Sequence, residues 1–154
     1  MVMRRRVNFF GIPVDDLTSH ELIERLDHSV SCRSKCQIVP LNANKLWLAE
    51  KDAKLRDVLL RTELVVPEYS VVWGGRVLGT PFAEHLGGIM LMRRMLIRAQ
   101  QERYRVYFLG ARDDIVQSMV NRLRAGMPGL IIAGWDHGYF QSEDEAVGLI
   151  DKSD

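Results

Sequence analysis

The chain has little cysteine and no long apolar segment, and both absences narrow what it can be. Its 154 residues include two cysteines, Cys32 and Cys36, which are too few for a disulfide framework and lack the second pair that a zinc site needs. We therefore expect free thiols in a reducing cytoplasm. No apolar run reaches the roughly 18 residues that span a membrane, and Gly11 and Pro13 interrupt the segment after the basic N-terminus. A secreted or integral membrane protein is not expected.

Several familiar catalytic motifs are also missing. The chain has no Gly-x-Gly-x-x-Gly fingerprint of dinucleotide-binding proteins, no P-loop and no nucleophile elbow. Its His, Cys, Asp and Glu residues show no metal-ligand spacing, and no Asp-x-Asp pair is present to hold a divalent ion under a nucleotide diphosphate. If the protein is an enzyme, we expect it to work without a metal ion or another cofactor.

Composition and charge are those of a globular protein. The chain is 47% hydrophobic and 27% charged, with a net charge of +1, which predicts one domain over residues 1–154. Such a balanced charge does not favour nucleic acid as a partner. From Arg76 to Arg124 all lysine and arginine positions are arginine. This bias fits either solvated helix faces or contact with an anionic ligand or an anionic membrane surface.

Apolar segments of strand length alternate with amphipathic segments of helix length from Gln37 onward. This alternation predicts an α/β fold of the Rossmann-like type, with a mostly parallel sheet and helices on both of its faces. The expected strands, after a strand or small hairpin at Val7–Val14, are Gln37–Leu41, Leu64–Val66, Arg105–Leu109 and Leu130–Ala133. The chain stops early in its last helix, where a βαβ unit would deliver another strand. Either that helix packs terminally or the domain is incomplete at its C-terminus.

Helix boundaries are predicted from capping residues. Thr18 and Glu21 have the spacing of a capping box, as do Ser142 and Glu145. Ser70 is expected to cap a helix that Gly79 ends. The side chains expected to face inward in this helix and the next are Val72, Trp73, Val77, Met92, Met95, Leu96 and Ala99.

The segment around Glu68 has the pattern of a binding site. The buried strand Leu64–Val66 is stopped by Pro67, which has no N–H for a sheet ladder, and Glu68 follows at once. Open α/β sheets bind ligands at the carboxyl ends of their strands. Glu68 is therefore a candidate general base or a ligand for a substrate hydroxyl. The alternative is a glutamate in a surface turn.

Three further segments place polar groups at expected strand ends. Asn42 and Asn44 follow the strand before the Glu68 strand, and each can bind a base, sugar or phosphate or simply cap the next helix. Gly110–Asp113 joins a strand to a helix, which suits a phosphate, although one glycine is weak support and Asp113 is expected as the N-cap. Trp135–Phe140 is an expected aromatic loop around His137. Its rings can stack on a base or sugar, or pack against the core.

The order and spacing of several segments resemble those of one bacterial family, the WecG/TagA/CpsF glycosyltransferases, which form N-acetylmannosamine-type linkages in cell-surface polysaccharides. The resemblance covers essentially the whole chain. The segments that carry it are Phe10–Asp15 with Thr18, Leu41–Ala43, Leu64–Glu68 with Val71–Trp73, Arg76–Gly79, Tyr107–Gly110 and His137–Phe140.

The resemblance implies an inverting, metal-independent enzyme. It would move an N-acetylhexosamine-type sugar from a UDP-sugar to a polyprenyl-diphosphate-linked sugar at the inner face of the plasma membrane, as a homo-oligomer with peripheral membrane contact. The aspartate proposed as general base in the family falls on Glu68, and an asparagine near the substrate falls on Asn42. The expected substrate-binding residues are Thr18, Asn42, Asn44, His85, Gly110, Arg112 and His137.

The chain departs from the family pattern at four points. Glutamate stands at position 68 where the family has aspartate followed by glycine, His85 stands in place of an arginine, and Met90 in place of an aspartate. The family also continues well past the length of this chain. These differences leave three functional classes open: an active glycosyltransferase, a divergent relative that binds a nucleotide-sugar without transferring it, and a structural or interaction module.

Overall fold

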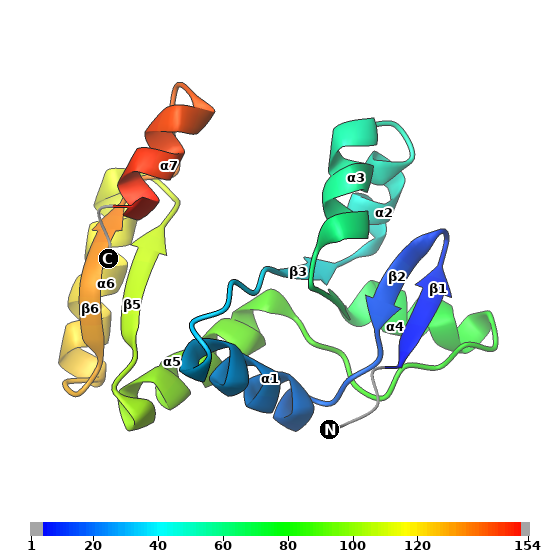
Figure 1. Cartoon of the computed structure of the whole chain (residues 1–154), viewed down its shortest axis with the longest axis horizontal. Coiled ribbons are helices and arrows are strands. Elements are labelled where there is room, and N and C mark those ends of the chain that lie inside the picture. The colour runs from blue at the N-terminus through cyan, green and yellow to red at the C-terminus, as the bar shows by residue number, and fades with distance from the viewer. Residues whose placement is uncertain (1–4, 152–154) are drawn as a thin grey trace. The chain divides into compact units, whose positions relative to one another are not determined.

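The computed structural model describes residues 5–151, which divide into two compact units on either side of the bond between Met92 and Arg93. Each unit is described by itself. Both combine helices with a short pair of parallel strands (Figure 1), so the chain has the predicted Rossmann-like α/β fold. The described strands form three two-stranded ladders. The expectation of one domain over residues 1–154 stays a prediction.

The first unit opens with an antiparallel hairpin made of β1 (Arg6–Phe9) and β2 (Ile12–Asp15). Its two turn residues, Phe10 and Gly11, have φ angles of 51° and 76°. Two left-handed residues give the turn the twist that a two-residue hairpin requires. The hairpin alternative of the sequence analysis is thereby confirmed.

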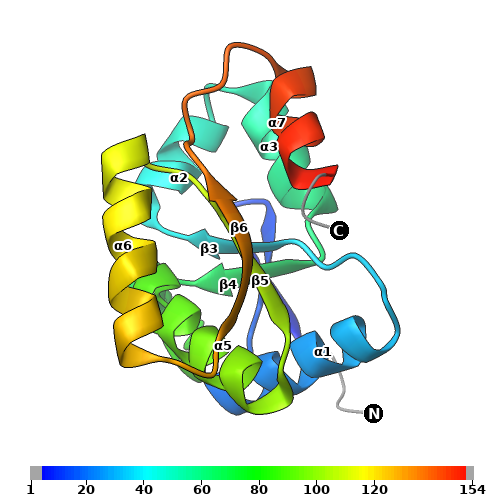
Figure 2. The same cartoon turned by 90° about the vertical axis from the view of Figure 1, so that its left-hand side faces the viewer.

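The second ladder of this unit is a parallel pair, β3 (Ile38–Leu41) and β4 (Leu64–Pro67), with Leu41 opposite Pro67. Two helices connect the strands, α2 (Ala43–Ala49) and α3 (Ala53–Arg61). The connection breaks between them, because Asp52 accepts hydrogen bonds from Lys54 N and Leu55 N at the start of α3. Figure 2 shows β3 and β4 side by side.

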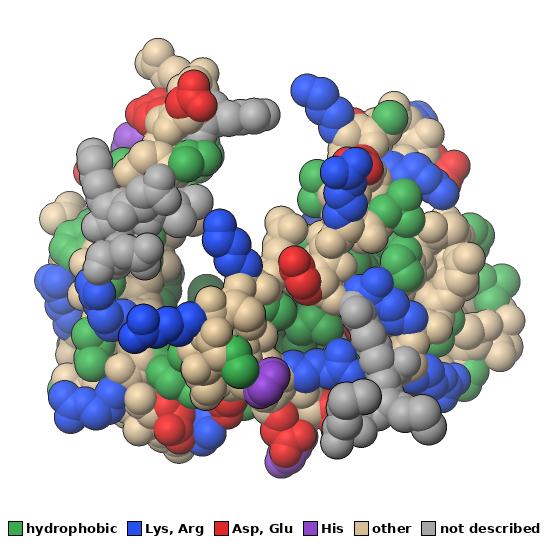
Figure 3. Space-filling view, in the orientation of Figure 1, with side chains coloured by type: hydrophobic (Ala, Val, Ile, Leu, Met, Phe, Trp, Pro, Cys, Tyr) green, Lys and Arg blue, Asp and Glu red, His purple; other side chains and the backbone are tan. Residues whose placement is uncertain are grey.

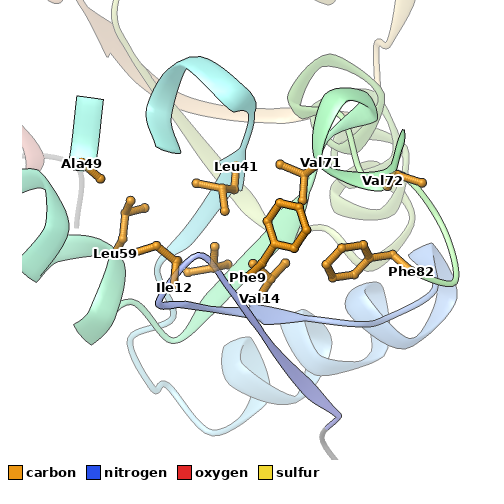
Figure 4. Packing of buried hydrophobic residues seen from close by; sticks show 10 residues of the cluster. Phe9, Ile12, Val14, Leu41, Ala49, Leu59, Val71, Val72 and Phe82 are labelled. Carbon is orange, nitrogen blue, oxygen red and sulfur yellow. The ribbon is translucent and has the colours of Figure 1, made fainter. Parts of the chain in front are cut away.

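The β3–β4 pair has an apolar cluster on each face, because successive side chains of a strand point to opposite sides. Leu64 and Val66 contact a cluster with α1 (Ser19–Ser31), whereas Val65 belongs to a cluster that includes hairpin side chains. Figure 4 shows this second cluster. It comprises Phe9, Ile12, Val14, Leu41, Ala49, Leu59, Val65, Val71, Val72 and Phe82. Helices therefore cover both faces of the pair, as predicted.

Helix α4 (Tyr69–Val77) differs from the prediction in its start and in its buried face. Its N-cap is Glu68, not Ser70, so the helix begins before the predicted cap. Val72 is buried as predicted, together with Val71, because both pack in the cluster of Figure 4, whereas Trp73 and Val77 are exposed, which corrects that expectation. Gly79 follows the helix end in a left-handed conformation, which confirms the predicted stop.

Helix α5 (Gly88–Glu102) crosses the division between the units, and its last part packs in the second unit. Leu96 and Ala99 are buried there as predicted, but Met92 and Met95 are exposed, which corrects that expectation. Arg93 and Arg94 are also exposed, as solvated helix faces require. On the face shown in Figure 3, Lys and Arg side chains are spread over each unit, with acidic side chains among them.

The second unit contains the parallel pair β5 (Arg105–Leu109) and β6 (Ile131–Asp136), followed by α7 (Glu143–Asp151). Helix α6 (Asp113–Gly126) joins the strands. Residues 134–136, predicted as loop, extend β6, because Trp135 packs against the apolar cluster of this unit. No helix within the described residues is long and apolar enough to cross a membrane.

Candidate functional site

The parallel ends of β3 and β4 bring Asn42 and Glu68 together. Each is the first residue after its strand, and the residues before them, Leu41 and Pro67, are partners in the ladder. The Asn42 Nδ2 amide donates a hydrogen bond to Glu68 Oε2 over 3.2 Å. Both side chains are half-buried. A carboxylate and an amide therefore share the strand-end position where α/β proteins bind ligands.

Asn42 caps α2, which is one of the two roles that the sequence left open, and it also contacts Glu68. Its Oδ1 accepts a hydrogen bond from Lys45 N at 2.9 Å, which caps α2, while its Nδ2 is directed to Glu68. Because the oxygen is held by the helix, the orientation of the amide is set, and the donor points at the carboxylate. A neighbouring contact holds the two loops together, since Ser70 Oγ accepts a hydrogen bond from Ala43 N at 3.0 Å. The sequence analysis missed this role of Ser70.

Glu68 is held by its backbone and leaves its carboxylate to the site. Its N–H donates to Leu41 O at 2.8 Å, which continues the strand pairing. Although it is the N-cap residue of α4, its side chain makes no capping hydrogen bond. A side chain added at Gly88 would place its Cβ 3.9 Å from Glu68 Oε1 and 3.5 Å from Pro40 Cγ. The glycine therefore leaves room beside the second carboxylate oxygen.

His85 lies in the loop that follows α4 and is exposed. Its ring meets that of Tyr69 edge to face, with 6.3 Å between the centroids. The loop is tied to the end of β4 because Leu86 N donates to Pro67 O at 2.7 Å. On the other side, Glu84 Oε2 accepts a hydrogen bond from Ser19 N at 2.7 Å, at the start of α1. The loop that carries His85 is thus fixed between β4 and α1.

Thr18 and Asn44, two other predicted substrate-binding residues, take local structural positions. Thr18 forms the predicted capping box with Glu21, since Thr18 Oγ1 accepts from Glu21 N at 3.3 Å and Glu21 Oε2 accepts from Thr18 N at 2.7 Å. The hydrogen bonds from the backbone and hydroxyl of Thr18 hold the pKa of Glu21 below its usual value. Asn44 is exposed on the first turn of α2.

In the second unit, Gly110 and His137 follow neighbouring parallel strands. Gly110 has a φ of 140°, and Ala111 after it has a φ of 63°. The two loops are joined because Gly138 N donates to Ala111 O at 2.9 Å. A Cβ at Gly138 would lie 2.8 Å from Gly110 Cα, so the approach of the loops requires glycine. His137 Nδ1 accepts a hydrogen bond from Tyr139 N at 3.2 Å.

The start of α6 differs from a simple phosphate cradle. Its N-cap is Arg112, which corrects the expectation that Asp113 caps the helix. The first turn holds both Asp113 and Asp114, and their negative charge already faces the positive end of the helix dipole. Arg112 donates to both carboxylate oxygens of Asp114, at 3.1 and 2.9 Å. This charge balance does not favour an anion at the helix start.

Tyr107 and Asp136 form a polar pair in the second unit that the sequence did not predict, although Asp136 lies in the segment expected as an aromatic loop. The Tyr107 hydroxyl donates to Asp136 Oδ2 over 2.5 Å, between the two parallel strands. The hydrogen bond to Asp136, together with burial, raises the pKa of Tyr107 to about 12. Among residues 5–151, no three His, Cys, Asp or Glu side chains gather closely enough to hold a metal ion.

Comparison with curated proteins finds N-acetylglucosaminyldiphosphoundecaprenol N-acetyl-beta-D-mannosaminyltransferases. The protein of Bacillus spizizenii is 27% identical over 114 residues, which are 73% of this chain and 44% of that protein. The proteins of Bacillus subtilis and Staphylococcus aureus are 24% and 26% identical, over 85% and 92% of this chain and 52% and 57% of their own. The chain thus spans about half the length of the curated relatives it matches.

The family comparison covers almost the whole chain. The model of the glycosyl transferase WecG/TagA/CpsF family matches residues 7–154, which include both strand-end sites. The resemblance drawn from the sequence motifs is therefore confirmed. The chain belongs to the WecG/TagA/CpsF family of glycosyl transferases.

Proposed function

We propose that the chain carries the catalytic base of a glycosyltransferase that moves an N-acetylhexosamine-type sugar from a UDP-sugar to a polyprenyl-diphosphate-linked sugar. The observation that carries the proposal is the hydrogen bond between Asn42 and Glu68 at the strand ends. Membership of the family and the names of the relatives support the acceptor class. We further propose that the donor is a UDP-sugar, that transfer inverts the anomeric configuration, and that the reaction needs no metal ion.

The reaction needs one proton acceptor and one leaving-group site. Glu68 takes the proton from the acceptor hydroxyl as that oxygen attacks the anomeric carbon of the donor sugar. The new carbon–oxygen bond forms on the face opposite the breaking bond to UDP, whose oxygen keeps the electron pair, so one displacement inverts the anomeric centre. The space that Gly88 leaves beside Oε1 suits the approaching hydroxyl. Asn42 is a positioning residue, since it acts by orienting the carboxylate.

His85 is the proposed contact for a phosphate oxygen of the substrate. It is exposed, and its loop is anchored to the end of the strand that delivers Glu68. A protonated imidazole supplies one positive charge, where the family's arginine supplies a permanent, two-pronged donor. The contributions of Thr18, Asn44, Gly110, Arg112 and His137 to substrate binding stay predictions, as does the homo-oligomer.

The acceptor class also sets the place of action. A polyprenyl-linked substrate resides in a membrane, and the reduced cysteines Cys32 and Cys36 fit a reducing compartment. We therefore propose that the protein acts in the cytoplasm, in peripheral contact with the inner face of the plasma membrane.

A second candidate function is a divergent relative that binds a nucleotide-sugar without transfer. His85 and Met90, which replace a family arginine and aspartate, favour it. Calorimetry with UDP and a transfer assay with a UDP-N-acetylhexosamine and a lipid-linked acceptor separate the candidates. Binding with transfer, unaffected by a chelator and giving a product of inverted anomeric configuration, supports the first. Binding of UDP without transfer supports the second. If neither binding nor transfer is found, the third class, a structural or interaction module, is favoured.

A further inference from the structure

An apolar groove of about 420 Å³ lies in the first unit, between the hairpin turn and helices α2 and α4. This volume is within the range of roughly 300–1,000 Å³ that is typical of small-molecule sites. Almost all of its lining is apolar. The lining residues are Phe9, Phe10, Ala43, Leu46, Ser70, Val71, Trp73, Gly74, Val77 and Leu78.

The groove adjoins the Asn42–Glu68 site. Ala43 directly follows Asn42, and Ser70 lies two residues after Glu68. The hydrogen bond from Ala43 N to Ser70 Oγ therefore forms a shared wall, with the polar strand ends on one side and the groove on the other. A molecule whose reacting group lies at Glu68 is therefore next to residues that line the groove.

Exposed apolar side chains continue the groove to the surface. Trp73 and Val77, four residues apart on α4, are 61% and 66% exposed, and Phe10 of the hairpin turn is 63% exposed. Large apolar side chains clustered at the mouth of an apolar groove mark a binding surface rather than a solvated face. Tyr69, one turn before Trp73, extends the same row toward His85.

We propose that this groove binds the isoprenoid chain of the lipid-linked acceptor, next to its diphosphate. The inference rests on the proposed function, and adds where the apolar part of the substrate lies. The chemistry of the lining selects the occupant. The lining has two polar side-chain groups, the Ser70 hydroxyl, which already accepts a hydrogen bond from Ala43, and the indole N–H of Trp73. A nucleotide placed there would lose hydrogen bonds to water without replacement, whereas a branched hydrocarbon loses none.

Gly74 gives a direct way to fill the groove. It lies on the groove wall, and a Cβ added there would be 3.5 Å from Phe9 Cζ, an ordinary contact. Gly74→Leu therefore extends into the groove and replaces a poor helix former with a good one. Gly148→Leu makes the same change at an exposed position of α7, where an added Cβ meets nothing within 4 Å, and serves as the control.

The test compares acceptors that carry the same diphosphate sugar on a geranylgeranyl chain and on a short alkyl chain. We expect Gly74→Leu to lower transfer to the geranylgeranyl acceptor, relative to the short one, by about tenfold or more, which corresponds to about 1.4 kcal/mol. Gly148→Leu should leave this ratio at the wild-type value. An unchanged ratio in Gly74→Leu overturns the groove assignment while the proposed function stands.

A binding readout covers the case in which the wild-type chain transfers to neither acceptor, which would overturn the proposed function. A photoreactive geranylgeranyl diphosphate is cross-linked to the protein, and the labelled peptides are mapped by mass spectrometry. Labelling of the hairpin turn and α4, lost in Gly74→Leu, supports the groove. Labelling elsewhere overturns it. If Gly74→Leu instead dissociates an oligomer in light scattering with labelling unchanged, the groove belongs to a second copy of the chain.

Discussion

The side-chain amide of Asn42 and the carboxylate of Glu68 are joined across the ends of two parallel strands, with 3.2 Å between Nδ2 and Oε2. The same asparagine caps α2 through its oxygen. One side chain thus connects the stability of a helix with the orientation of the proposed base.

Variants of Asn42 should separate these two roles. Asn42→Ser keeps a capping oxygen but has no amide donor, so the melting temperature should stay close to wild type while the transfer rate falls. Asn42→Ala should lose both, with a stability cost of about 1 kcal/mol. Thermal melts and initial rates measure the two effects. Equal activity of Asn42→Ser and the wild type would show that the amide does not orient Glu68.

Two adjacent glycines of α4 should respond oppositely to alanine. A Cβ at Gly75 would lie 2.5 Å from Thr80 O and 2.9 Å from the Phe82 ring, so Gly75→Ala should destabilise the protein by about 1–3 kcal/mol. Gly74→Ala meets no such contact and should stabilise it by up to about 1 kcal/mol through helix propensity. Urea unfolding curves of both variants check the signs, and a stable Gly75→Ala would contradict the packing described here.

The buried carboxylate of Asp15 should be a main anchor of the hairpin. Asp15 is 0% exposed, accepts from Arg6 Nε at 3.0 Å and from Val65 N at 3.0 Å, and so ties β2 to both β1 and β4. Asp15→Ala leaves these donors without that partner and should cost about 3–5 kcal/mol. The exposed pair of Asp57 and Arg61 is the control, since Asp57→Ala should change stability by less than about 0.5 kcal/mol. Similar losses in both variants would contradict the assignment.

Alkaline titration tests the Tyr107–Asp136 pair. Because the pKa of Tyr107 is raised from its ordinary 10.0 to about 12 in the folded protein, its contribution to stability is present below pH 10 and is lost as the pH rises toward 12. The difference in tyrosinate absorbance between the wild type and Tyr107→Phe should show this late titration. Asp136→Asn removes the neighbouring charge and should move the titration to lower pH. An ordinary titration of Tyr107 in the wild type would refute the pair.

Local signals predicted much of the fold. The Thr18 capping box and the stop at Gly79 each depend on residues a few positions apart, and both are confirmed. The buried face of α4 was predicted in part: Val72 is buried as expected, whereas Trp73 and Val77 are exposed. Which face turns inward is set by packing against residues distant in sequence, which local spacing does not show. The extent of β6 was missed because the packing of Trp135 depends on residues distant in sequence.

The candidate site was predictable in part. That Asn42 and Glu68 follow neighbouring strands can be inferred from alternating strands and helices, since parallel strands end at the same edge. That Ser70 would hold Ala43 instead of capping α4 could not, because the contact depends on the helix phase and on a neighbouring loop. The ion pair of Arg112 with Asp114 could not be predicted from the sequence either, because it depends on the conformers that the two side chains adopt.

The transfer rate of Glu68→Gln, measured together with UDP binding, tests whether Glu68 is the catalytic base. Glutamine keeps the size and the hydrogen-bonding capacity of the side chain but cannot take the proton, so the rate should fall by about 10²–10⁴-fold while UDP affinity stays at the wild-type value. Glu24→Gln, the same change at an exposed position of α1, should leave both unchanged. A Glu68→Gln protein that transfers at the wild-type rate would contradict the assignment of Glu68 as the base.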